Sequence, residues 1–194
     1  MEDKALRNAI RFVALANLAY FVIEFSVARA IGSVSLFADS VDFLEDASVN
    51  FLILGTLNWR PRARARVGML LAGILLVPAL AALLTAWQKL TENVAPAAAP
   101  LSLTALGALV VNLTCAFILA GYRHHRGSLT KAAFLSARND ALANLAIIAA
   151  GILTAWWPTI WPDLIVGIGV AVLNAGAARE VWSAAREEHA TPQP

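Results

Sequence analysis

The sequence predicts an all-α membrane protein in which six membrane-spanning helices form one bundle. Of its 194 residues 59% are hydrophobic, and a mean hydropathy of +0.67 is too apolar for a soluble domain. Apolar runs recur along the chain, and a helix needs about 20 such residues to cross a bilayer. Basic residues cluster at the ends of these runs, as is usual in membrane proteins. This placement explains the net charge of +2 without nucleic-acid binding.

Six apolar runs define the predicted spans, which are separated by short polar linkers. They cover residues 12–29, 34–57, 67–90, 101–122, 131–156 and 163–182. The first run is too long for the core of a signal peptide, so we expect it to be retained as a span. Residues 1–182 are therefore predicted to form one transmembrane domain, followed by a short polar tail over 183–194. The single cysteine, Cys115, lies within an apolar run and is expected to be a core residue.

The distribution of lysine and arginine predicts the orientation of the bundle. If the N-terminus is cytoplasmic, twelve of the fifteen basic residues fall on the cytoplasmic side, and only Arg29 and Lys89 fall on the other. Loops rich in lysine and arginine remain in the cytoplasm. We therefore expect a multi-pass protein of the cell inner membrane with both termini in the cytoplasm.

The second span carries four carboxylates, although each costs roughly 2.5 to 3.5 kcal/mol at the centre of a membrane helix. At 100° per residue, Asp39, Asp42, Asp46 and Asn50 fall within about 80° of one another, and Glu45 lies beside them. These residues form a polar stripe that requires water, a cation or a partner. Asp39 and Glu45 are candidates for the access route or the proton path.

The fifth span carries a second polar stripe around Asp140, the remaining aspartate that lies fully within a span. Ser136, Asp140 and Asn144 share one face of this helix, and Asn139 lies beside it. Arg138 points away from this face, and a structural ion pair with Glu24 or Glu45 would satisfy it.

The two polar stripes lie at matching depths in the bilayer. A rise of about 1.5 Å per residue brings Asp46 level with Asp140 and Asp42 level with Asn144, because the two helices run in opposite directions. Three carboxylates that meet in a medium of low dielectric repel one another unless a metal ion or protons neutralise them. The same oxygens can then bind either a divalent metal or protons, which is the basis of a metal/proton exchanger.

Two other interpretations of these residues are weaker. A role in hydrogen bonding between helices fits a single buried aspartate better than three like charges. An enzymatic role finds no support, because the chain contains no nucleophile elbow, phosphate-binding loop or zinc-protease helix. No cofactor is expected, and the metal ion is the transported substrate.

At this point the chain resembles the cation diffusion facilitator family, whose members are six-span exporters of divalent metals. The resemblance rests on three features in order: Gly32-Ser33-Val34-Ser35-Leu36, Asp42-x-x-x-Asp46, and the fifth-span pair that ends in Asp140. The sixth span, which opens with Trp161-Pro162-Asp163 and Gly167, is also similar. It implies that Asp42 and Asp46 pair with Ser136 and Asp140 as the metal ligands. It also implies a homodimer that exchanges metal for protons at one site per protomer.

The chain departs from the pattern of this family in two ways. Zinc transporters of the family commonly have His or Asp where this chain has Ser136, so Asn139, Asn144 or water is expected to complete the shell. Typical members also continue into a cytoplasmic metal-binding domain after the sixth span, and we expect this chain to be a short member without it.

The metal and the mode of action remain open at this level. The resemblance favours Zn²⁺ or Cd²⁺, whereas a site built from oxygen ligands also suits Mn²⁺, Fe²⁺ or Co²⁺. One alternative is a non-transporting membrane partner or regulator of a full-length exporter. Another is a proton-coupled carrier of organic cations, which would have an aromatic-lined cavity.

Overall fold

The computed structural model describes residues 2–55, 80–121 and 127–173 of the chain. These residues form α1 (Glu2–Ile31), α2 (Val34–Gly55), α4 (Ala98–Ala120) and α5 (Gly127–Trp156), together with helical segments at 80–92 and Trp161–Leu173. No strand occurs among the described residues. The predicted all-α fold is confirmed, and each of the six predicted spans contains one of these helical segments.

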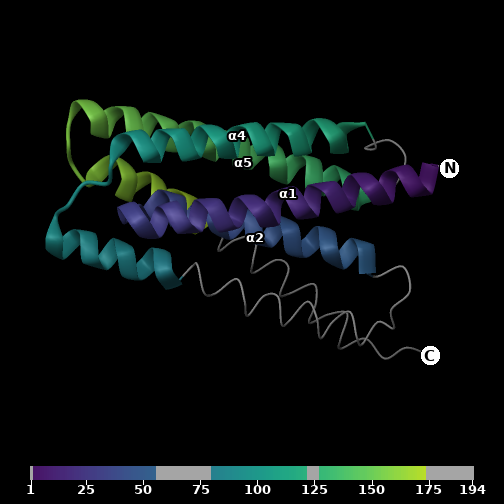
Figure 1. The fold of residues 1–194 in the computed structure, drawn as a ribbon, viewed down its shortest axis with the longest axis horizontal. Helices are drawn as coiled ribbons and strands as arrows, with labels where there is room; N and C mark the ends of the chain where they lie inside the picture. The colour runs from purple at the N-terminus through teal and green to yellow at the C-terminus, as the bar shows by residue number, and fades with distance from the viewer. Residues whose placement is uncertain (1, 56–79, 122–126, 174–194) are drawn as a thin grey trace.

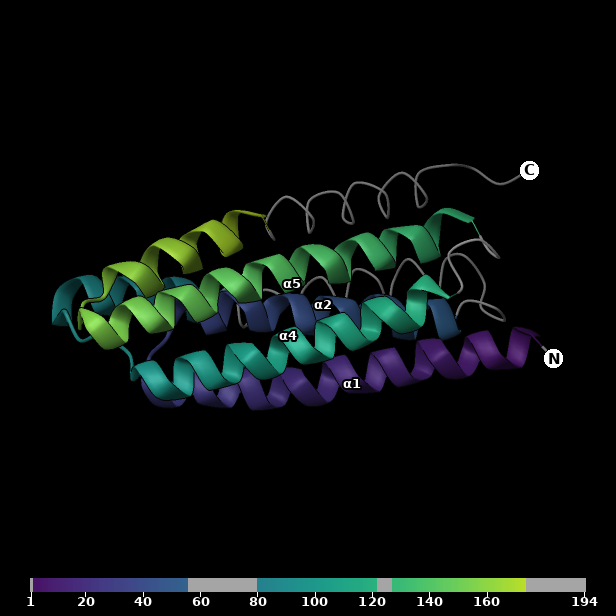
Figure 2. The same cartoon turned by 90° about the horizontal axis from the view of Figure 1, so that it is seen from above.

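The helices lie side by side along the long axis of the molecule (Figures 1 and 2). α1 packs along α2 and also contacts α4, α4 packs along α5, and the contact between α2 and α5 is the sparsest of these. The links at 32–33, 93–97 and 157–160 meet at the end of the bundle opposite the N-terminus, which we call the distal end (Figure 1).

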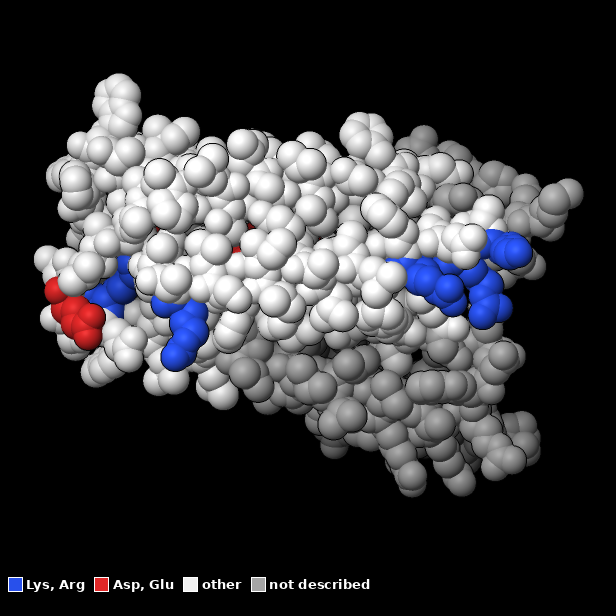
Figure 3. All heavy atoms as spheres, viewed as in Figure 1, with Lys and Arg blue, Asp and Glu red and all other residues white. Residues whose placement is uncertain are grey.

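Among the residues that the structure describes, three helices are long and apolar enough to cross a membrane, over Lys4–Ile31, Ala98–Ala120 and Asn139–Trp156. α2 has a comparable length of 22 residues but contains the four carboxylates of the polar stripe. Figure 3 shows the charged side chains gathered near the two ends of the visible face, with an uncharged band between them. The chain is therefore a multi-pass membrane protein, and Glu24, Asp39 and Asp163 are buried within its bundle.

The turn between α1 and α2 explains the Gly-Ser motif at residues 32–33. Gly32 adopts a φ of +62°, which a residue with a side chain rarely does. The backbone N–H of Ser33 then donates to the carbonyl of Ala28 at 3.0 Å, which closes α1 with a Schellman-type bond. Ser33 also begins α2, because its Oγ accepts a hydrogen bond from the N–H of Leu36 at 3.2 Å.

The hydrophobic core is densest in the distal half of the bundle. Leu36, Leu101 and Ile147 are fully buried there, where α2, α4 and α5 meet. A smaller cluster around Val13 and Cys115 joins α1 to α4 nearer the N-terminus, which confirms Cys115 as a core residue. The chain is thus closely packed at the distal end, beyond the polar residues of α2 and α5.

Candidate cation site

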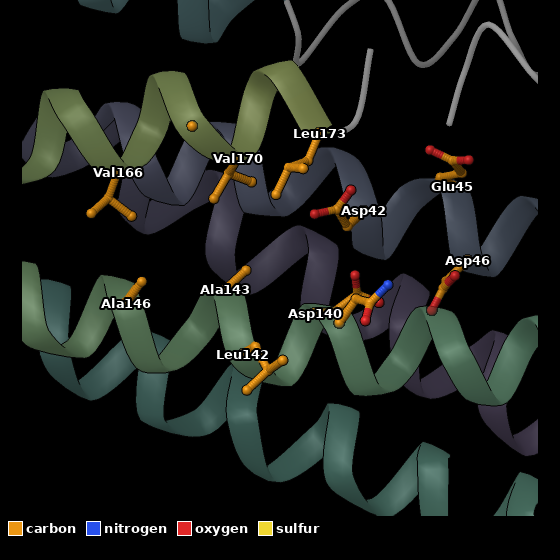
Figure 4. A pocket seen from close by; sticks show the side chains of 12 residues that line it. Asp42, Glu45, Asp46, Asp140, Leu142, Ala143, Ala146, Val166, Val170 and Leu173 are labelled. Carbon is orange, nitrogen blue, oxygen red and sulfur yellow. The ribbon is translucent and has the colours of Figure 1, made fainter. Parts of the chain in front are cut away.

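A cavity of about 610 Å³ lies between α2, α5 and the segment Trp161–Leu173. Its polar lining comes from facing positions on two helices, and its apolar lining comes from α5 and Trp161–Leu173 (Figure 4). The polar residues are Asp42, Glu45, Asp46, Asn139 and Asp140, and the apolar ones are Leu142, Ala143, Ala146, Val166, Gly169, Val170 and Leu173. The three aspartates predicted to bind metal therefore share one cavity.

The negative charges of several neighbouring carboxylates act on Asp42. It interacts with Asp140 on α5 and with Asp39, Glu45 and Asp46 on its own helix, and Asp140 has the largest effect of these charges. Figure 4 shows Asp42 and Asp140 in the space between α2 and α5. Repulsion of this kind in an apolar bundle is relieved by a bound cation or by protons. The region around Asp42 and Asp140 therefore favours a positively charged ligand.

The carboxylates share the cavity without closing on a single point. Within the described residues, no three His, Cys, Asp or Glu side chains are placed to hold a metal ion together. Asp42, Asp46 and Asp140 belong to helices whose mutual contact is sparse, so the spacing of these side chains depends on how α2 and α5 approach each other.

Two asparagines repeat the same local arrangement on the two helices. Asn50 Nδ2 donates to the backbone carbonyl of Asp46 at 2.7 Å, and Asn144 Nδ2 donates to that of Asp140 at 2.9 Å. Both amide oxygens are buried and receive no hydrogen bond. Each asparagine therefore donates one hydrogen bond within its own helix, one turn from an aspartate. The Asn144 side chain also interacts with Asp39 on α2.

The other predicted site residues lie in different surroundings. Asn139 lines the cavity, whereas Asn144 is fully buried and is not among the lining residues. Asp39 is likewise fully buried and lies away from the cavity wall. The side chain of Ser136 is outside the described residues, so its assignment as a ligand stays a prediction.

Sequence reasoning missed the environment of Glu24 on α1. Its carboxylate is fully buried and interacts with those of Asp39 and Asp42. The expected ion pair with Arg138 involves a side chain outside the described residues. A carboxylate in the middle of the first span was the available signal, but its neighbours depend on how α1 packs against α2.

Sequence reasoning also missed the partners of Asp163, which is fully buried at the distal end. Its carboxylate accepts hydrogen bonds from the hydroxyls of Ser33 and Ser35, both at 2.6 Å. It also accepts from the backbone N–H groups of Val34 at 2.9 Å and Ser35 at 3.2 Å. Lys89 Nζ lies 3.4 Å from the same carboxylate. The signal in the sequence was an aspartate directly after Pro162, at the start of a helix.

Comparison with known families gives one match that covers most of the chain. The family model described as the cation efflux transmembrane domain matches residues 10–187. It includes all the residues that line the cavity and the residues around Asp163. Among curated proteins, none matches the chain.

Proposed function

This chain belongs to the cation efflux family of membrane transporters, and on that premise we propose that it exports a divalent transition metal in exchange for protons. The observation that carries the proposal is the shared cavity of Asp42, Asp46 and Asp140 within an apolar bundle. Three anionic oxygen donors suit a divalent cation, and the same groups bind protons when the cation leaves. Competition between the two ligands couples metal flux to proton flux.

The chemistry of the site narrows the range of cations. Asp42, Asp46 and Asp140 supply hard oxygen ligands. Asn139, which lines the same cavity, and Ser136, which the family resemblance implies, are the candidate neutral oxygen ligands. Family membership favours Zn²⁺ or Cd²⁺, whereas oxygen ligands also accept Mn²⁺, Fe²⁺ and Co²⁺. Glu45, which lines the same cavity, supplies a further carboxylate on the route that a cation or proton takes.

Alternating access follows from the way the helices are paired. Asp42 and Asp46 belong to α2, and Asp140 belongs to α5. α2 contacts α5 less than it contacts α1, and α5 contacts α2 less than it contacts α4. A small shift between them changes the spacing of the carboxylates and therefore the affinity for a cation. We place both termini in the cytoplasm of a cell with the protein in its inner membrane, so that the distal end faces outward.

Transport by the purified chain in liposomes tests the proposal. Vesicles that contain only this protein, with an indicator for Zn²⁺, Cd²⁺ or Mn²⁺ inside, should take up metal when a proton gradient is imposed, with protons moving the opposite way. The matched control carries Asp42→Asn, Asp46→Asn and Asp140→Asn together and should show neither flux. If folded wild-type protein moves no metal, the proposal fails, and a regulatory partner of another exporter becomes the better interpretation.

A further inference from the structure

Asp163 contacts Ser33, Val34, Ser35 and Lys89 at a point that we call the junction. The contacts there provide hydrogen-bond partners for the backbone N–H groups at the start of α2. The first four backbone N–H groups of a helix have no partner within it. Here the N–H of Ser33 bonds to the carbonyl of Ala28, Asp163 accepts those of Val34 and Ser35, and the Ser33 hydroxyl accepts that of Leu36. The start of α2 is therefore held by a carboxylate about 130 residues further along the chain.

The junction joins three helical segments at one point. Asp163 belongs to Trp161–Leu173, the serines belong to the start of α2, and Lys89 belongs to 80–92. Asp163 is 0% exposed and Lys89 is 5% exposed. Lys89 Nζ also donates to the carbonyl of Val94 at 3.2 Å, in the distal link. Charge-assisted bonds of this kind are stronger than bonds between neutral groups.

The helices at the junction are in direct backbone contact. A Cβ atom added to Gly167 would lie 2.7 Å from the Ser35 nitrogen and 2.8 Å from the Val34 carbonyl carbon. Val34 also packs with the buried side chains of Ile160 and Leu164. The start of α2 and the start of Trp161–Leu173 therefore form one closed contact.

This closed contact lies between the cavity and the distal surface. The lining residue of Trp161–Leu173 nearest the distal end is Val166, one turn beyond Asp163 along the helix, and the lining residue of α2 nearest that end is Asp42. Val34 and Leu36, which lie between Asp42 and the distal end of α2, are buried. Separation of the start of α2 from Trp161–Leu173 would therefore open a route from the cavity to the distal end.

A polar junction suits a contact that has to open. Separating an apolar contact costs free energy because its surface becomes exposed to water. When a polar contact separates, its hydroxyl, carboxylate and ammonium groups can form hydrogen bonds to water in place of the hydrogen bonds that they lose. The open and closed arrangements then differ little in free energy, and a ligand can shift the balance between them.

We propose that Asp163 is a positioning residue that latches the distal end of the cation path shut, and that its release from Ser33 and Ser35 opens the cavity on that side. The role in transport rests on the function proposed above. The closure itself is independent of metal and can be measured without transport.

Side-specific cysteine labelling tests the latch. The background variant is Cys115→Ala, which removes the native thiol. Ala143→Cys then places a single thiol in the cavity wall. The rate at which this thiol reacts with a membrane-impermeant maleimide is measured from each side of sealed vesicles. A separate Ala97→Cys variant, exposed in the distal link, identifies which side the distal end faces. Adding Ser33→Ala and Ser35→Ala should raise labelling from the distal side about tenfold, because two hydrogen bonds to a charged group are lost.

The matched control is Ser40→Ala. Ser40 is also a buried serine of α2, but its Oγ donates to Phe37 in its own helix at 2.7 Å. It should leave distal labelling unchanged. The double serine variant should not speed labelling from the opposite side, whereas a generally loosened protein would react faster from both sides. Equal distal labelling in the double variant and the control, or a rise from both sides, would overturn the latch.

A charge-neutral pair provides a second measurement. Asp163→Asn alone would leave Lys89 buried without its counter-ion, so it is combined with Lys89→Gln, which removes both charges at similar volume. This variant should also label faster from the distal side only, and an unchanged rate in the folded variant would contradict the latch. Absence of metal transport by wild type together with altered labelling would reject the proposed function and leave the latch standing.

Discussion

Asp42 on α2 and Asp140 on α5 line the same cavity from helices that belong to different tightly packed pairs, and the negative charge of Asp140 acts on Asp42. α1 pairs with α2, and α4 pairs with α5. The carboxylates therefore sit at a boundary where the bundle can adjust without loss of its main contacts. This relationship is what the proposed cation binding and the proposed change of affinity rest on.

Asp42→Asn, Asp46→Asn and Asp140→Asn should each reduce metal transport at least about tenfold, because each removes one anionic ligand of similar shape. The unfolding temperature without metal should stay the same or rise, since one of several like charges is removed. Vesicle flux and thermal unfolding in detergent measure the two effects. Glu92→Gln, which changes an exposed carboxylate in the same way, serves as the control. Retained transport in any two of the aspartate variants would remove the site assignment.

Ser136→His should increase the preference for Zn²⁺ over Mn²⁺. An imidazole nitrogen is a good ligand for zinc and a poor one for manganese, whereas a hydroxyl contributes little to either. The histidine must be neutral to bind, so the zinc affinity of the variant should rise with pH through about 6.5. Calorimetric titration of both metals at two pH values checks this. If the preference is unchanged in the folded variant, Asn139 or Asn144 becomes the better candidate for the fourth ligand.

Gly167→Ala should destabilise the protein by about 1 to 3 kcal/mol, the usual cost of overpacking. The added methyl group would meet the backbone of Val34 and Ser35, which cannot turn aside as a side chain can. Gly169→Ala is the control on the same helix, because a Cβ there meets nothing within 4 Å. Thermal unfolding of both variants measures the difference, and equal stability would show that the two helices are less closely joined at this point.

The protein should form a homodimer through its spans, as the family resemblance implies. Helix association in a membrane relies on close packing and interhelical hydrogen bonds rather than on the hydrophobic effect. The dimer should therefore persist in mild detergent and dissociate in harsher detergent. Mass determination by light scattering after size-exclusion chromatography measures this. A monomer that retains full transport in dilute liposomes would contradict the expectation.

Local regularities in the sequence determined the helices and the polar stripe. The length and polarity of the apolar runs predicted where helices lie, because a bilayer demands internal backbone hydrogen bonds. Helical periodicity placed Asp42 and Asp46 on one face, and a fixed rise per residue brought Asp140 to their depth. The structure agrees that these three residues share a cavity.

Only the tertiary structure decided how each helix is rotated and which helices are neighbours. Asp39 belongs to the same stripe as Asp42, yet it lies buried beside Glu24 of α1 and away from the cavity wall. From the sequence alone, Asp163 is recognised only as a polar residue at the start of a span. Its role as the acceptor for Ser33 and Ser35 depends on the contact of two helix ends that lie about 130 residues apart. Periodicity describes one helix at a time, whereas these contacts arise from the packing of several helices. Side-chain volumes and the close approach of two helices at Gly167 determine how the helices are arranged.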